Sequence, residues 1–483
     1  MNGSSGVPWQ ARFGHPLFLW LLLAELGLAA VSAVSMAAGQ PAGVIIVLVL
    51  PAQLLIVCAL FSSNLFLLYF FAALFPLAGL ELLPQVYSEV VLYGGTLGLV
   101  VLLLVTEPVI RKATREPILD RAGKAYLWVL FVSVVLSGAV AVFGGRATGA
   151  MIRSAVGMVF VIAAAWVFAA VPRSIGDVKG LLLAVILAHA VSCVLLPMFA
   201  VTSSGLLVTK TLLTPFGRPT LNLFGFFIGP LAAALLGITL DTAGWRTRTI
   251  AVVLIAGLLA ALVYTNSRGA WVGFGFAYLY ILARRRSPIL LASTVVATVL
   301  FMSLDFLRRP IALRLGQTQA GDPAMVGRYL LWASALQMVA RNWLFGVGTA
   351  NFVALKFEYG FPVWLDPYVR FNAHNLYLEV FASLGILGIV SFLWLQIRTA
   401  VRLDRLARVA KEPGTRGLAL GLCAGLLAYS VHGLVESSAW HTPTLTLWGV
   451  LIGLSMALDR LCRPDRATGP ATCAGTTVTH AAT

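Results

Sequence analysis

Long apolar runs dominate this chain, and they leave it few ways to fold. Runs of about 20 residues, long enough to cross a bilayer as helices, recur along the sequence. Hydrophobic residues make up 60% of the 483 residues and charged residues only 11%. These proportions are far from those of a soluble domain. The sequence therefore predicts an all-α polytopic membrane protein, because helices satisfy their own backbone polar groups in lipid.

The apolar runs predict about 14 spans, and these group into four regions. We expect N-terminal transmembrane helices over 1–307, a long segment containing short helices over 308–375, C-terminal transmembrane helices over 376–462, and a disordered tail over 463–483. The predicted spans start near Pro16, Ala42, Leu65, Val86, Tyr126, Ser154, Gly180, Leu221, Thr249, Ala270, Ile289, Leu376, Gly417 and Leu445.

The net charge of +16 does not indicate a nucleic-acid partner, because most basic residues lie in short gaps between apolar runs. Basic gaps of this kind mark the cytoplasmic loops of membrane proteins. The densest basic gaps are 111–124, 173–179, 246–248, 284–286 and 398–416. If these are cytoplasmic, both termini are cytoplasmic, and the segment 308–373 lies on the outer face.

A second group of basic residues lies on the predicted outer face, where few carboxylates are available to pair with them. Because an arginine is costly near lipid, it is retained where it meets an anion. The outer face therefore indicates an anion site. The basic residues are Arg146, Arg153, Lys210, Arg218, Arg268, Arg308, Arg309, Arg314, Arg328, Arg341, Lys356 and Arg370. The carboxylates are Asp322, Glu358, Asp366 and Glu436.

Three of these arginines are candidates to hold a diphosphate, since a guanidinium can donate two parallel hydrogen bonds. Arg268 lies in a polar turn between two apolar runs, where it could also simply mark a helix end. Arg328 heads a predicted amphipathic helix over 327–340 that precedes a glycine-rich turn at 345–348. Arg218 precedes another span on the same face, and its functional and structural interpretations both stay open.

His374 stands where a polar segment enters the apolar run that starts at Leu376. An imidazole with an unperturbed pKa near 6.5 suits a general base. Arg370, Asn375 and Tyr377 surround it in the sequence and are predicted to contact the substrate. The alternative is an interfacial histidine with no chemical role.

Two further sets of residues on the predicted outer face could contact a substrate. Glu436 lies in a short loop with His432, Trp440 and His441, and could add a carboxylate to the site. Aromatic side chains in the long segment could stack on sugar rings or form an interfacial belt. They are Trp343, Phe352, Phe357, Tyr359, Trp364 and Tyr368.

Several sequence signals are absent. There is no Walker motif and no dinucleotide-binding glycine fingerprint. The predicted outer face has no acidic pair or His/Asp cluster suited to a divalent metal. The sequence thus indicates neither a cofactor nor a metal. His189, inside an apolar run, is expected to have a packing role.

Four motifs, in order, resemble those of the O-antigen ligase and O-antigen polymerase superfamily. The resemblance covers about Arg218 to Gly388. The motifs are Ser267-Arg268-Gly269, Gly327-Arg328 with Trp332, Phe345-Gly346-Val347-Gly348 with Asn351-Phe352, and His374 to Glu379 with Leu384 to Gly388.

The resemblance implies a metal-independent glycosyltransferase of the GT-C type, whose membrane core usually has about 12 helices. Together with the count of apolar runs, this predicts about 12 to 14 transmembrane helices. Such enzymes take a glycan from undecaprenyl diphosphate at the periplasmic face of the bacterial inner membrane. By resemblance, His374 matches the essential histidine of the family, and Arg268 and Arg328 match its two essential arginines. Transfer would invert the configuration of the transferred sugar.

The resemblance favours an O-antigen ligase, whose acceptor is lipid A-core, in lipopolysaccharide biosynthesis. A polymerase of O-antigen or exopolysaccharide repeat units, with a lipid-linked glycan as acceptor, is an alternative, and so is a protein O-glycan transferase. From another class, a lipid-linked oligosaccharide flippase or a transporter could also line an outer cavity with arginines. A transporter should place charges near the bilayer midplane and often has two related halves, whereas charges here collect at one surface.

Overall fold

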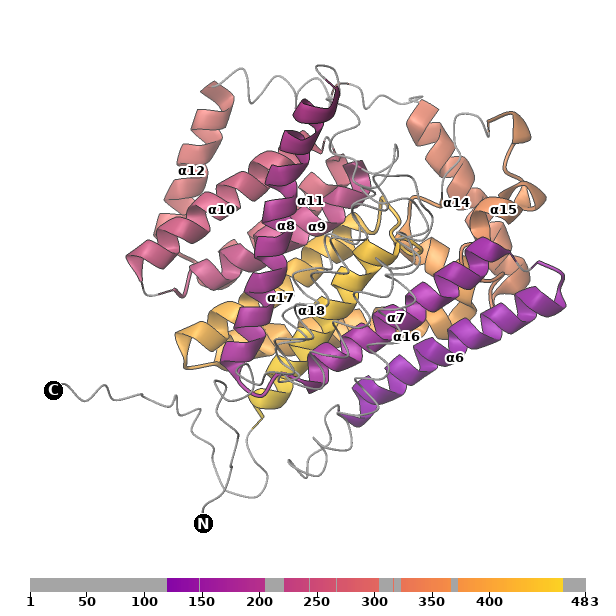
Figure 1. Cartoon of the computed structure of the whole chain (residues 1–483), viewed down its shortest axis with the longest axis horizontal. Coiled ribbons are helices and arrows are strands. Elements are labelled where there is room, and N and C mark those ends of the chain that lie inside the picture. The colour runs from indigo at the N-terminus through magenta and orange to yellow at the C-terminus, as the bar shows by residue number, and fades with distance from the viewer. Residues whose placement is uncertain are drawn as a thin grey trace, which may run out of the picture.

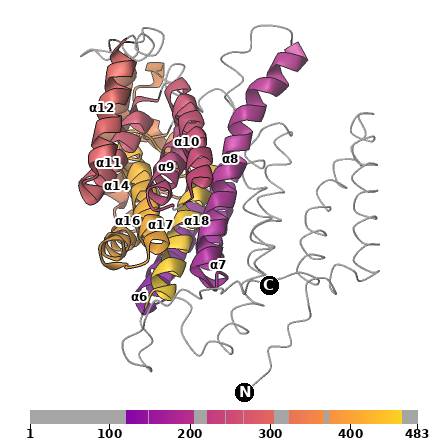
Figure 2. The same ribbon diagram turned by 90° about the vertical axis from the view of Figure 1, so that its left-hand side faces the viewer.

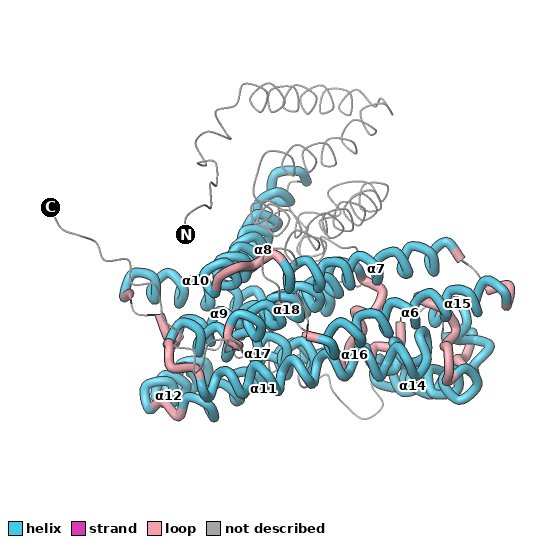
Figure 3. Tube along the Cα trace, turned by 90° about the horizontal axis from the view of Figure 1, so that it is seen from below, coloured by secondary structure: helices cyan, strands magenta, loops and turns pink. Residues whose placement is uncertain are grey.

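The computed structural model describes residues 120–204, 221–303, 323–365 and 372–463, apart from 147, 243 and 266, together with residue 316. All regular structure in these ranges is helical (Figures 1 and 3). The main helices are α6 (Arg121–Phe143), α7 (Gly149–Ala170), α8 (Ile175–Ser204), α9 (Leu221–Thr239), α10 (Trp245–Tyr264), α11 (Arg268–Arg285), α12 (Pro288–Ser303), α14 (Pro323–Asn342), α16 (Leu376–Val409), α17 (Pro413–His432) and α18 (Thr442–Leu461). Short elements are α15 (Phe352–Leu355), η1 (Lys356–Tyr359) and η2 (Val363–Leu365).

The chain is an all-α polytopic membrane protein. Among the described residues, 6 helices are long and apolar enough to cross a membrane, and Leu223–Thr239 forms a shorter apolar helix. Each predicted span from Tyr126 onward corresponds to one of the helices α6–α12 or α16–α18. The spans predicted to start near Pro16, Ala42, Leu65 and Val86, and the predicted tail beyond Arg463, lie outside the described residues.

The helices form a bundle in which α17 packs against α9, α11 and α16 (Figures 1 and 2). Glycines allow the closest approach: a Cβ added to Gly237 of α9 would lie 2.4 Å from the Cα of Gly421. Gly421 and Gly425 of α17 are four residues apart and both lie at this contact with α9, a spacing of small residues that is typical of helices packed in membranes. Large buried side chains, among them Phe392 and Trp448, fill the remaining core.

The described loops group at the two ends of the bundle. We call one the site end; it holds the loops 144–148, 265–267 and 433–441. We call the other the basic end; it holds the loops 171–174, 240–244, 286–287 and 410–412. Ion pairs tie helices together at the basic end: Asp120 with Arg398, Arg402 with Asp459, Asp241 with Arg285 and Arg416, and Arg284 with Asp404.

The predicted amphipathic helix at Arg328 is confirmed as α14, and the glycine-rich turn follows it. This turn docks on α16 where that helix is interrupted at Gly385, whose φ is 67°. Val347 N donates to Ala382 O at 2.9 Å, and Ile386 N donates to Trp343 O at 2.8 Å. A break in a membrane helix requires such partners for its freed backbone groups. The turn after α14 thus supplies hydrogen-bond partners for α16 at its break and holds the two helices together.

Candidate active site

His374 is held in an unusual backbone conformation directly before α16. Its φ is 47°, in the left-handed region that few non-glycine residues adopt. The His374 N–H donates to Asn372 Oδ1 at 3.0 Å, and the preceding Ala373 N–H donates to Glu379 Oε2 at 2.8 Å. Asn372 Nδ2 in turn donates to Ser437 O at 3.2 Å. Side chains on both sides of His374 therefore hold the conformation of its backbone.

Asn375 anchors the mouth of α16 to the loop that follows α17. Its Oδ1 caps the helix by accepting from the N–H groups of Tyr377 and Leu378, both at 3.0 Å. Its Nδ2 donates to Leu434 O at 3.0 Å. The Leu376 N–H donates to Gly433 O at 2.8 Å. These bonds join the start of α16 to the loop that carries Glu436.

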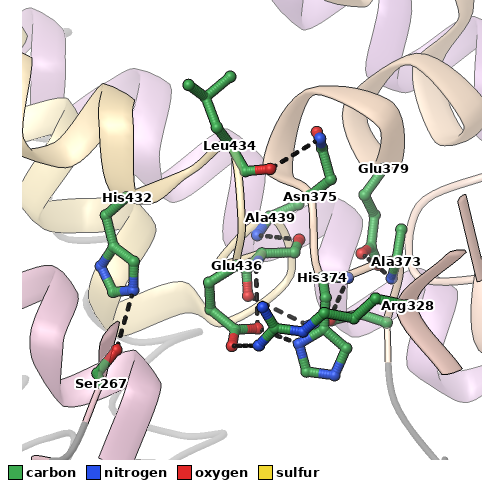
Figure 4. A network of polar contacts seen from close by, with 12 residues as sticks. Ser267, Arg328, Ala373, His374, Asn375, Glu379, His432, Leu434, Glu436 and Ala439 are labelled. Atoms are coloured by element: carbon green, nitrogen blue, oxygen red, sulfur yellow. Dashed lines mark hydrogen bonds and ion pairs between the residues drawn. The ribbon is translucent and has the colours of Figure 1, made fainter. Parts of the chain in front are cut away.

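Glu436 connects the histidine to an arginine (Figure 4). Its Oε1 accepts from His374 Nδ1 at 2.6 Å and from the Ser437 N–H at 3.1 Å. Its Oε2 lies 3.8 Å from Arg328 Nη2. We call His374, Glu436 and Arg328 the site triad. The triad joins residues from α14, the mouth of α16 and the loop between α17 and α18.

Glu436 is the carboxylate in the triad, and it is almost fully buried. Burial raises the pKa of its carboxyl. His374, and to a smaller extent Arg328, lower the pKa by more than burial raises it, so the pKa lies below its usual value. Glu436 is therefore ionised at neutral pH. An ionised carboxylate at Nδ1 favours the tautomer of His374 that carries its proton there and its lone pair on Nε2.

Arg268 begins α11 beside the same loop. Ser267 Oγ caps this helix and lies 3.4 Å from Nε2 of His432, the last residue of α17. A Cβ added to Gly269 would lie 2.6 Å from Val435 Cγ2. The backbone on both sides of Arg268 thus lies against the turn that leads into Glu436.

The structure places some predicted residues away from the triad. Tyr377 OH donates to Ser430 O at 2.8 Å, between α16 and α17. Phe352 and Tyr359 are buried in the core of the long segment, which corrects their prediction as sugar-stacking faces. His189 is buried and its Nδ1 bonds Val185 O, as expected for a packing role. Arg218, Arg370 and Tyr368 lie outside the described residues.

Sequence reasoning did not predict the support that Glu379 gives to the backbone before His374. Glu379 is fully buried, although a carboxylate in the first turn of an apolar helix is a visible signal in the sequence. Glu436 was predicted as a carboxylate of the site, but its bond to His374 was not, because 62 positions separate the two residues. Within the described part of the chain, no group of three or more His, Cys, Asp or Glu side chains could hold a metal ion.

Comparison with protein families matches part of the chain. Residues 250–393 match the family model described as O-antigen ligase. The matched region runs from α10 into α16 and includes Arg268, Arg328 and His374. It ends before Glu436, so the carboxylate of the triad lies outside it. No curated protein matches the chain.

Proposed function

We propose that this chain is an O-antigen ligase, a membrane glycosyltransferase of the GT-C type. It would transfer a glycan from undecaprenyl diphosphate to a sugar of lipid A-core in lipopolysaccharide biosynthesis. The observation that carries the proposal is the bond from His374 Nδ1 to Glu436, with Arg328 on the other carboxylate oxygen, at the mouth of a membrane helix. The match over residues 250–393 supports the choice of reaction.

His374 acts in this proposal as the general base. Glu436 holds the Nδ1 proton, so Nε2 takes the proton of the acceptor hydroxyl as its oxygen attacks the anomeric carbon. The carboxylate then stabilises the imidazolium that forms, as a buried acid does in a catalytic triad. The new glycosidic C–O bond forms as the bond to the diphosphate breaks. Because the attack comes from the face opposite the leaving group, the anomeric configuration inverts.

Arg268 and Arg328 stabilise the departing diphosphate. Arg328 approaches Glu436 through one nitrogen at 3.8 Å, a loose ion pair for a group with five N–H donors. Its remaining donors can bind phosphate oxygens as negative charge develops on them. We propose that the two guanidinium groups supply the positive charge for this step without a metal ion, so transfer should proceed in chelator. Arg218, Arg370, Asn375 and Tyr377 stay predicted substrate contacts.

We place the site at the periplasmic face of the bacterial inner membrane. The basic end carries arginine-rich stretches such as Arg284 to Arg286, where α11 ends, and such stretches remain in the cytoplasm. The site end therefore faces the periplasm, where a lipid-linked glycan and lipid A-core can meet.

The test is glycan transfer by purified protein given undecaprenyl-diphosphate glycan and lipid A-core in chelator. Wild-type protein should transfer, and His374→Ala should lose at least about 10²-fold in rate. His189→Gln, which alters a histidine of α8 outside the triad, serves as the matched control. Elongation of the lipid-linked glycan without transfer to core would replace the ligase by a polymerase. A wild-type protein with no chemistry on either acceptor would favour a flippase or transporter.

A further inference from the structure

An exposed apolar stripe runs along α14, the helix that carries Arg328. Tyr329, Leu336 and Trp343 repeat at intervals of seven residues and are 58%, 56% and 55% exposed. Residues that lie between these three on the same face of the helix, such as Ala333, are exposed as well. We call the whole set the α14 stripe: Val326, Tyr329, Ala333, Leu336, Ala340, Trp343 and the adjoining Leu344.

The other faces of α14 are already occupied. Leu331, Ala335 and Met338 are fully buried in the core of the long segment. Gln337 and Arg341 form an exposed polar flank beside the stripe, and Arg341 lies over the Tyr359 ring at 5.5 Å. The helix therefore has a buried face, a polar flank and an apolar face without cover among the described residues. This division is typical of a helix lying at a membrane surface.

A backbone hydrogen bond joins the end of α14 to the interrupted part of α16. Trp343 O accepts from the N–H of Ile386, which lies ten positions after Leu376, the first residue of α16. Ile386 directly follows the break at Gly385. The end of the stripe therefore lies beside the apolar run of α16, a candidate membrane span. Figure 1 shows α14 running crosswise to α6 and α7.

The stripe continues the exposed surface of a candidate span. The loop after α14 touches the end of α6, since a Cβ added to Gly348 would lie 2.9 Å from Ala141 Cβ. Around that point α6 exposes Val140, Val142 and Phe143, the last at 91%. A tryptophan at the junction of such surfaces is typical of the membrane interface.

We infer that the α14 stripe lies in the lipid leaflet at the site end, packed against acyl chains. The helix then holds Arg328 at the level of the lipid headgroups, next to Glu436. One consequence rests on the proposed function: a donor with its isoprenoid chain in the same leaflet would bring its diphosphate to Arg328 by lateral movement, without leaving the membrane.

Spin-label accessibility tests the location without requiring activity. Leu336→Cys and the matched control Gln337→Cys, made in a variant with the 5 native cysteines replaced, would each carry a nitroxide in phosphatidylethanolamine and phosphatidylglycerol vesicles. Size-exclusion profiles matching the wild type are the criterion for a folded variant, and Ala340→Cys is a second stripe position. We expect labels on the stripe to collide mainly with lipid-soluble oxygen, and the label at position 337 mainly with a water-soluble nickel chelate.

Two results would overturn the inference. Equal collision of stripe and flank labels with the nickel chelate would place the stripe in water. Protection of the stripe labels from both reagents would mean that protein covers it, for example a second copy of the chain. Because neither result depends on glycan transfer, failure here stays distinct from failure of the proposed reaction.

Discussion

His374 depends on its neighbours for a conformation that its own residue type does not favour. A non-glycine residue in the left-handed region costs roughly 1–2 kcal/mol. Here Asn372 Oδ1 accepts from the His374 N–H, and Glu379 Oε2 accepts from the Ala373 N–H. Strain of this kind is maintained where the surrounding structure fixes it, most often at functional sites. The imidazole is thereby aimed at Glu436 before any substrate binds.

Replacing Glu436 by Gln removes the charge of the triad while keeping its shape. We expect the transfer rate to fall by about 10²- to 10⁴-fold, the range found when proton transfer loses its support. An amide cannot stabilise the imidazolium as the carboxylate does. The control is Glu358→Gln, an exposed carboxylate 3.9 Å from Arg146 at the same end. Wild-type kcat in Glu436→Gln would remove Glu436 from the mechanism.

The lowered pKa of Glu436 also predicts how stability depends on pH. An unfolded glutamate takes up its proton near pH 4.3, whereas the folded carboxyl does so at lower pH. Between these values the unfolded state binds more protons, so stability falls as pH falls. The melting temperature of Glu436→Gln should therefore fall less than that of the wild type as the pH is lowered from about 5 to about 3. Parallel curves for the two proteins would contradict the pKa assignment.

Glu379 should act as a positioning residue, because its carboxylate holds the backbone directly before His374. Glu379→Leu leaves the buried Ala373 N–H without its acceptor, at a cost of about 1–3 kcal/mol. Glu379→Gln retains an acceptor oxygen. We expect Glu379→Leu to have a lower transfer rate and a lower melting temperature than the wild type. Glu379→Gln should stay close to the wild type in both. Equal loss of rate in the two variants would instead point to a role for the charge.

At the scale of elements, α14 and α16 form one unit, because the turn after α14 fills the break in α16. Gly385 sits in this break, and a Cβ there would lie 2.3 Å from Leu344 O. Neither that contact nor the φ of 67° suits a side chain. The glycine is thus needed for the two backbones to meet.

Gly385→Ala should disrupt the contact between α16 and the turn after α14. We expect a lower melting temperature, with a cost of at least about 1 kcal/mol from the backbone conformation alone. Transfer should also slow, because α14 carries Arg328 to the triad. Gly257→Ala in α10 is the matched control, since a Cβ there meets nothing within 4 Å. A Gly385→Ala protein as stable and active as the control would show that the break is not required.

At the scale of the whole molecule, local patterns predicted the helices but not how they meet. Apolar runs located α6 to α12 and α16 to α18, and the polar segment before Leu376 located His374 at a helix mouth. The pairing of His374 with Glu436 depends on which loops converge at one end of the bundle. The break at Gly385 was equally hidden, because its backbone partners come from the turn after α14.

The two ends of the molecule differ in charge, and this difference predicts its orientation. Positive loops stay in the cytoplasm, so the basic end should face the cytoplasm and the site end the periplasm. In a cysteine-free variant, Glu358→Cys at the site end should react with a membrane-impermeant maleimide in intact spheroplasts. Lys411→Cys, exposed between α16 and α17 at the basic end, should react only after lysis. The reverse pattern would put the triad on the cytoplasmic face, away from the proposed acceptor, and the ligase reaction would then have no access to its substrate.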